Sequence, residues 1–282
     1  MKLSSYICLL ALIMFAPFCR SSDVNPAQVD IITVDQLKWG YLNPLRGEKS
    51  PGAVDLWGDR TKNVATGMLV RFNKGFSSPP HIHNITYRGI VIHGAMHNDD
   101  PDAAHMWLPP VSFWTQPAGK QHVTAANADK NLIYLEIDSG PYLVKPESNH
   151  FDSGGHALNV HAANLVWLDH SQSAIVTSSN IEIAHLWRNN KVHDAESSLQ
   201  GILLKLESGI PIDIQSQDPI FKAVIIQGAI TYQSSTNNAK YQLEEGSLFS
   251  SSGDVMHRIT PTNNAIIYIR SHADFSARAK SK

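Results

Sequence analysis

The segment from Gly75 to His122 constrains the fold of this chain more than any other. It contains two histidines separated by one residue, His81 and His83, and it ends on a third, His122. Alternate residues of a β-strand point to the same face, so His81 and His83 can present their imidazoles side by side. A histidine from a different strand would complete a facial trio around a metal ion. The segment therefore predicts a metal pocket inside a β-barrel, because barrel closure can return His122 to the other two.

The residues around these histidines resemble the two motifs of the cupin superfamily. The first motif is matched by Gly75, His81, His83 and Gly94, and the second by Pro117, Gly119 and His122. Residues 77–87 and 113–122 are also similar to an uncharacterised bacterial group of cupin-like proteins, known only as a domain of unknown function. The resemblance implies a cupin barrel and a metal ion held by His81, His83 and His122, but it implies no particular reaction.

Tyr87 stands where cupins have a ligating glutamate, and this is the departure from the first motif. One interpretation is that its ring fills the space of the missing carboxylate while its hydroxyl bonds a water, a ligating imidazole or the substrate. The other is direct ligation, which requires a strongly acidic metal because a free phenol titrates at about 10. We expect the first. His93 shares strand parity with Tyr87 and is a second candidate to face the pocket, unless it is a core histidine with one hydrogen bond.

An internal repeat sets the domain organisation. Residues 67–75 and residues 201–209 share their glycines and their alternating apolar residues, at an offset of 134 positions. The same offset relates residues 132–135 to residues 266–269. Both copies consist of short apolar runs broken by turn residues, a pattern typical of β-strands. We therefore expect an all-β protein made of two tandem cupin barrels, a bicupin.

Only the first copy carries the histidine pattern. At the same offset, the counterparts of His81, His83, Tyr87 and His122 are Gln215, Gln217, Phe221 and Met256, with His257 one residue away. Amide and thioether groups are poor ligands for divalent ions of intermediate hardness. We expect the second barrel to bind no metal and to be structural, either covering the first barrel or forming the interface of a homodimer. A small-molecule site in the second barrel is the alternative.

The N-terminal residues have the features of a secretory signal peptide. Lys2 is followed by an apolar run over 7–18 that is too short to span a membrane. Both cysteines, Cys8 and Cys19, lie in this segment, so the mature chain would have no thiol. We expect cleavage after Ser21 and a periplasmic or secreted protein. The predicted parts are a signal peptide at 1–21, a metal-binding barrel at 22–147, a linker at 148–155, a degenerate barrel at 156–275 and a tail at 276–282.

The charge and hydropathy of the chain argue against two classes of partner. The formal net charge is −2, and the lysines and arginines are scattered along the sequence. We therefore expect no nucleic-acid binding. No apolar run after the signal peptide reaches membrane-spanning length, so we expect no membrane contact in the mature form. The expected partner is a small molecule.

Three neutral imidazoles would leave the charge of a divalent ion uncompensated, because the carboxylate of the cupin motif is absent. Such an ion is a stronger Lewis acid and attracts anionic or chelating ligands. The pattern resembles the three-histidine sites of cupin dioxygenases that bind iron(II). We expect one divalent transition metal, iron, zinc or manganese, in a dioxygenase-like enzyme in which Tyr87 or His93 hydrogen-bonds the substrate. The alternative is a non-enzymatic bicupin that binds or senses a small ligand.

Overall fold

The computed structural model describes residues 28–104, 106–189, 199–234, 238–272 and 275–280. The signal peptide expected at 1–21 lies outside these residues. Within them, β-strands dominate, and the helices are short 3₁₀ segments: η1 (Val34–Gln36), η2 (Pro44–Lys49), η3 (Glu147–Asn149) and η4 (Ala162–Asn164). None of these is long and apolar enough to cross a membrane. The expected all-β class is confirmed.

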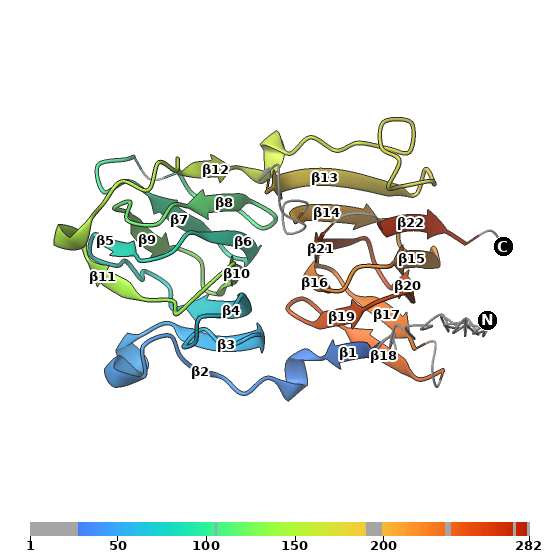
Figure 1. Cartoon of the computed structure of the whole chain (residues 1–282), viewed down its shortest axis with the longest axis horizontal. Helices are drawn as coiled ribbons and strands as arrows, with labels where there is room; N and C mark the ends of the chain where they lie inside the picture. Colours follow the sequence, from blue (N-terminus) through green and yellow to red (C-terminus); the bar gives the residue numbers. More distant parts are fainter. Residues whose placement is uncertain (1–27, 105, 190–198, 235–237, 273–274, 281–282) are drawn as a thin grey trace, which may run out of the picture.

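The first half of the chain forms a barrel around a seven-stranded antiparallel sheet (Figure 1). The strands of this sheet are β2 (Gly40–Tyr41), β3 (Gly52–Trp57), β4 (Thr66–Phe72), β6 (Tyr87–His93), β8 (Phe113–Gln116), β10 (Asn131–Ile137) and β12 (Leu158–Val160), in the order β12-β8-β6-β10-β4-β3-β2. Two strand pairs complete the barrel, β5 (His81–His83) with β11 (Val144–Pro146) and β7 (Met96–Asp99) with β9 (Val123–Ala126).

The second half repeats this plan with one sheet of six strands and one of five. The six-stranded sheet contains β1 (Gln28–Ile32), β13 (Ile181–Arg188), β14 (Gln200–Leu206), β16 (Phe221–Gln227), β19 (Leu248–Ser252) and β21 (Ala265–Ser271), in the order β1-β19-β16-β21-β14-β13. The five-stranded sheet contains β15 (Ile212–Ser216), β17 (Ile230–Gln233), β18 (Lys240–Leu243), β20 (Val255–Pro261) and β22 (Phe275–Ala279), in the order β18-β17-β20-β15-β22. The internal repeat thus corresponds to two tandem barrels.

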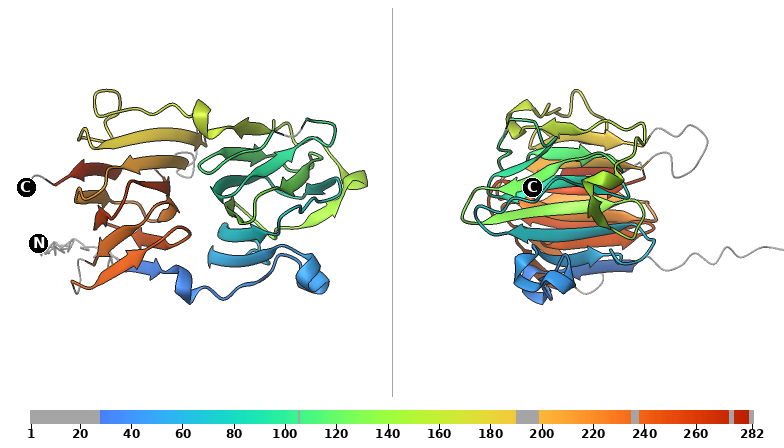
Figure 2. Two further views of the ribbon diagram at one scale, coloured as in Figure 1. Left: turned by 180° about the vertical axis from the view of Figure 1, so that it is seen from behind. Right: turned by 90° about the vertical axis from the view of Figure 1, so that its left-hand side faces the viewer.

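The chain crosses between the barrels at two edges. Strand β1 pairs with β19 of the second barrel, although it lies in the range 22–147 expected for the first. Strand β12 pairs with β8 of the first barrel, although it follows the expected linker at 148–155. Figure 2 shows both crossings from behind, the blue segment along one edge and the yellow-green segment along the opposite edge. The expected domain boundaries remain predictions, and in the structure each barrel includes one strand from outside the range expected for it.

The large sheets of the two barrels pack against each other. Their facing apolar side chains include Leu69, Ile90, Leu203 and Val224. At the centre, buried Glu136 accepts hydrogen bonds from Tyr268 Oη at 2.7 Å and from Arg270 Nη1 at 3.3 Å. Glu136 and Arg270 occupy equivalent positions in the two copies of the repeat. Two identical barrels would place the same charge at both positions, whereas here a carboxylate faces a guanidinium. The second barrel therefore covers one face of the first.

Candidate metal centre

The three predicted histidines come together at one end of the first barrel. His81 and His83 lie on β5, and His122 immediately precedes β9. Two backbone hydrogen bonds join the segments, from His81 N to His122 O at 3.1 Å and from His122 N to His81 O at 3.0 Å. All three side chains are buried, and one ring nitrogen from each lies within 4.8 Å of the others.

The backbone fixes the orientation of two of the imidazoles. His81 Nδ1 lies 2.9 Å from the carbonyl oxygen of Pro79, and His122 Nδ1 lies 3.3 Å from that of Lys120. A carbonyl oxygen only accepts hydrogen bonds, so each ring carries its proton on Nδ1. Each Nε2 therefore keeps a free lone pair, and this arrangement is typical of histidines that bind a metal.

His83 has a different environment. Its Nε2 lies 3.3 Å from the hydroxyl of Tyr142, and the two rings stack with centroids 4.4 Å apart. Its Nδ1 is buried and has no hydrogen-bond partner among the described residues. A buried polar atom without a hydrogen-bond partner destabilises the fold unless a ligand binds it. Coordination of a metal ion by the His83 imidazole would offset part of this destabilisation.

The electrostatics of the pocket keep the three imidazoles neutral. Burial lowers the pKa of His81, and it lowers the pKa of His122 to about 3 with a further contribution from the neighbouring His81. Burial also lowers the pKa of His83 well below its usual value, and both neighbouring imidazoles add to the effect. Metal ligation requires neutral imidazoles. The trio therefore fits a divalent transition-metal ion at neutral pH.

Tyr87 lies against the trio, as expected of a residue that replaces the cupin glutamate. Its hydroxyl donates to Asn98 Oδ1 at 2.8 Å and lies 3.2 Å from His122 Nε2. Asn98 also accepts from Thr124 Oγ1 at 2.8 Å and donates to Gln116 Oε1 at 3.1 Å. Burial raises the pKa of Tyr87 above its usual value, so the phenol stays protonated. This geometry places a hydroxyl donor beside a ring nitrogen of the trio.

Two residues of this site were not found from the sequence. Tyr142 precedes β11, whose pairing with β5 carries its ring onto His83. Asn98 lies on β7, which pairs with β9 next to His122. Neither belongs to a cupin motif. Both are brought to the site by strand pairings that the local sequence pattern does not specify.

His93 is not brought to the trio. In the pairing of β6 with β10, Val91 and His93 lie opposite the adjacent residues Ile133 and Leu132, so β6 contains one extra residue. Such a β-bulge breaks the alternation of side chains between the two faces. His93 consequently points toward the second barrel, where its Nε2 lies 3.0 Å from Glu245 Oε2. The parity argument that grouped it with the pocket assumed an unbroken strand.

In the second barrel, strand pairing shifts the correspondence between the two copies by one residue from the constant offset of 134 seen in the sequence. Met96 pairs with Ala126 in the first barrel, and Ile230 pairs with Pro261 in the second. Ile230 lies 134 positions after Met96, but Pro261 lies 135 positions after Ala126. The second copy therefore has one extra residue between β17 and β20. The counterpart of the third histidine is His257, and not the methionine before it.

His257 is a retained histidine that is not arranged for ligation. Its Nδ1 lies 2.9 Å from the Tyr232 hydroxyl, and its Nε2 lies 2.9 Å from Ser251 Oγ. Burial lowers its pKa to about 3. Gln215, which lies 134 positions after His81, donates to Asp254, and Ile214 pairs with His257 as His81 pairs with His122. Among the residues that the structure describes, the first-barrel trio is the one cluster of metal-ligating side chains.

A cavity of about 870 Å³ lies beside the trio in the first barrel. Its polar lining includes His81, His83, Tyr87, Asn98, Trp114 and Tyr142, and the charged residues Arg46, Arg60, Lys145 and Glu147 also line it. Its apolar lining includes Leu42, Val70, Phe72, Phe76, Ile133 and Leu135. The indole Nε1 of Trp114 is buried and has no hydrogen-bond partner in the described part of the chain. This cavity has the size and composition of a small-molecule site.

Fold and site together define a bicupin, a protein of two tandem cupin barrels of which the first carries a buried histidine trio. The chain belongs to the family described as a domain of unknown function, DUF4437, whose model matches residues 30–278. No curated protein sequence matches the chain.

Solved structures of cupin enzymes share the fold. A proposed dioxygenase from Nostoc punctiforme PCC 73102 is similar with a TM-score of 0.63 and 13% identity, over 91% of this chain and 88% of the other. Salicylate 1,2-dioxygenase from Pseudoaminobacter salicylatoxidans, solved with gentisate, gives 0.54 and 11%, over 82% and 77%. Lactobacillus farciminis oxalate decarboxylase, in its formate complex, gives 0.57 and 10%, over 88% of each chain. At these identities the likeness establishes the cupin fold.

Proposed function

We propose that this protein binds one divalent transition-metal ion through His81, His83 and His122. We further propose that it is a dioxygenase-like enzyme acting on a small anionic or chelating organic substrate. The observation that carries the proposal is the convergence of three neutral imidazoles beside a cavity, with Nε2 of His81 and His122 left free by their backbone contacts. Iron, zinc and manganese all suit a site of this donor type.

An ion in this site would supply Lewis-acid chemistry, and iron(II) would add reactivity toward O₂. The protein's part is to bind and orient the substrate. The converging ligand set contains no carboxylate, so a bound divalent ion keeps its charge and favours an anionic oxygen donor. The protonated hydroxyl of Tyr142 and the N–H of Trp114, which has no hydrogen-bond partner among the described residues, can donate hydrogen bonds to that oxygen. The Tyr87 hydroxyl donates its single proton to Asn98, so it would have to release Asn98 to do the same.

One observation favours the alternative, a bicupin that binds or senses a ligand without transforming it. The titratable side chains in contact with the trio are Tyr87 and Tyr142. Burial raises the pKa of both above the usual value, so neither accepts or releases a proton near neutral pH. A reaction that needs a general base would have to take it from the substrate, from water or from Glu147, which also lines the cavity.

Oxygen uptake distinguishes the two functions. Protein loaded anaerobically with iron(II) would be mixed with O₂ and a panel of diketones, thiols and hydroxy acids, with the His83→Ala variant treated identically. We expect at least one compound to cause O₂ consumption that depends on His83. Tight binding of panel members without any O₂ consumption would favour the binding protein instead.

A further inference from the structure

We propose that the ligand of the first barrel is an amphipathic acid with an extended apolar body. Its oxygen-donor head would bind at the metal centre, and its body would fill the barrel interior and reach the apolar side chains at the mouth. The identity of the head group rests on the proposed function, whereas the apolar body rests on the cavity alone.

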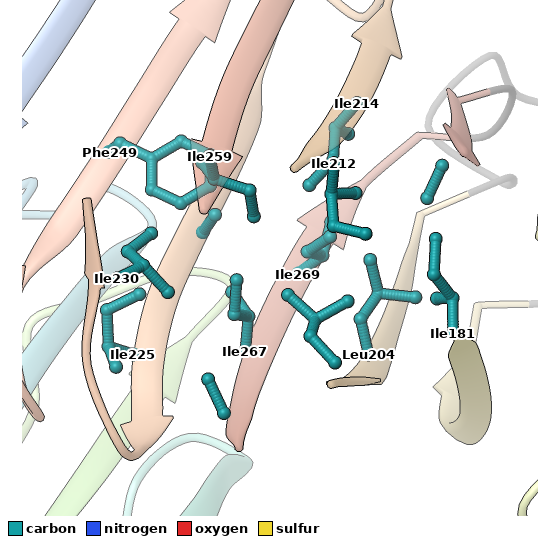
Figure 3. Close-up of a cluster of buried hydrophobic side chains, with 14 of the residues drawn as sticks. Ile181, Leu204, Ile212, Ile214, Ile225, Ile230, Phe249, Ile259, Ile267 and Ile269 are labelled. Carbon is teal, nitrogen blue, oxygen red and sulfur yellow. The ribbon is translucent and has the colours of Figure 1, made fainter. Parts of the chain in front are cut away.

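The two barrels differ in how their interiors are filled. In the second barrel, isoleucines and Phe249 form a cluster of buried side chains, as Figure 3 shows. Ile212 and Ile214 of that cluster are fully buried. Their counterparts in the first barrel are Ser78 and His81, because Ile212 lies 134 positions after Ser78 and Ile214 pairs with His257 as His81 pairs with His122. Both Ser78 and His81 line the cavity. The first barrel therefore has polar side chains where the second has apolar side chains in its core.

The hollow space retains the apolar wall of a core. Val70, Phe72, Ile133 and Leu135 line the cavity at the positions where the second barrel has Leu204, Leu206, Ile267 and Ile269 in its packed interior. Ligand pockets of roughly 300–1,000 Å³ hold drug-sized molecules, and a volume of about 870 Å³ is in the upper part of that range. A two-carbon acid would leave most of this wall without contact. A ligand with a bulky apolar body would cover it.

The apolar surface continues outward at the cavity mouth. Leu143 and Val144 line the cavity and yet are 43% and 55% exposed. We call Leu143 and Val144 the apolar collar. Because the collar is continuous with the cavity wall, an apolar body that projects from the barrel would bury both.

A series of straight-chain hydroxamates tests the proposal. Their bidentate oxygen head binds zinc, and only the alkyl length changes from acetohydroxamate to octanohydroxamate. Calorimetry on the zinc-loaded protein should show affinity rising by about fourfold for each methylene group that enters the cavity. If acetohydroxamate binds and the longer members bind no more tightly, the ligand has no apolar body in the cavity, and the proposal of a metal centre is unaffected. Absence of acetohydroxamate binding would instead count against the proposed function.

Variants at the collar separate the body from the head. Val144→Ser should weaken octanohydroxamate binding severalfold and leave acetohydroxamate binding unchanged. Val166→Ser, at an apolar side chain that is 72% exposed and does not line the cavity, is the matched control and should change neither. Val70→Phe, which fills the cavity, should abolish the dependence on chain length. Because the Val144 side chain is largely exposed, its variant stays informative even if Val70→Phe does not fold. Unchanged octanohydroxamate binding in Val144→Ser would remove the collar from the site.

Discussion

Buried histidines determine how the stability of this protein responds to acid. Burial lowers the pKa of His122 and of His257 from 6.5 to about 3. The unfolded chain takes up these protons below about pH 6.5, and the folded chain does not until about pH 3. The free energy of unfolding therefore falls as the pH drops through this window.

Denaturant unfolding of metal-free protein checks this dependence. Between about pH 6 and pH 5, each such histidine should lower the free energy of unfolding by about 1 kcal/mol. His257→Gln removes one histidine that is not a proposed ligand, so the variant should show a shallower slope. An unchanged slope would mean that His257 already carries a proton in the folded protein.

Tyr87 is the residue at which this chain departs from the cupin motif. Tyr87→Phe keeps the ring and its packing, so we expect the fold and the metal content to persist. Loss of the hydroxyl should weaken binding of an oxygen ligand by about 1 kcal/mol, the value of one hydrogen bond. Calorimetry with acetohydroxamate measures this change, and Tyr142→Phe provides the matched comparison at His83.

Tyr87→Glu tests the same position from the opposite direction. It would restore a carboxylate beside the trio, and we expect tighter metal binding together with weaker binding of anionic ligands. Iron(III)-loaded wild-type protein should show no phenolate charge-transfer colour. A colour that Tyr87→Phe abolishes would make Tyr87 a metal ligand and contradict its assignment as a hydroxyl donor.

At the scale of single elements, the sequence was most informative where one short strand suffices. His81 and His83 are adjacent on one face of β5, and the period of a strand alone predicts that. The site residues that escaped prediction depend on pairing between strands. A one-residue bulge in β6 turns His93 toward Glu245, and the pairing of β11 with β5 places Tyr142 against His83.

The internal repeat had the same limit. The constant offset correctly predicted two barrels because it holds for the large sheets, where β4 pairs with β10 and β14 pairs with β21 in the same register. One extra residue between β17 and β20 changed the offset locally, so the retained third histidine is His257. A local insertion changes which residue faces inward, although it leaves the fold intact.

For the molecule as a whole, the contact between the barrels depends on a buried charge pair. Glu136 accepts from Arg270 and Tyr268, and all three are nearly inaccessible to solvent. Removing the carboxylate would leave the Arg270 guanidinium with only Asp138. We therefore expect Glu136→Gln to destabilise the protein by about 3 kcal/mol.

Urea unfolding measures this cost against a surface pair. Glu182 contacts Lys205 at the surface, and Glu182→Gln should change the free energy of unfolding by less than about 1 kcal/mol. Equal effects of Glu136→Gln and Glu182→Gln would show that the buried pair does not hold the barrels together.

Export is a further property of the whole chain, which we propose from residues 1–21. The mature protein should begin near Ser22 and contain no thiol, because Cys8 and Cys19 are removed with the signal peptide. Intact mass and thiol titration of protein recovered from outside the cytoplasm would check this. A mass that includes Cys8 would refute cleavage.

The central claim is that the first barrel alone binds one metal ion, and elemental analysis tests it most directly. Purified wild-type protein should contain about one transition-metal ion per chain. His83→Ala should reduce this content to near zero, and Gln215→Ala, a change in the second barrel, should leave it unchanged. Two ions per chain, or metal retained in His83→Ala, would contradict the assignment of His81, His83 and His122 as the site.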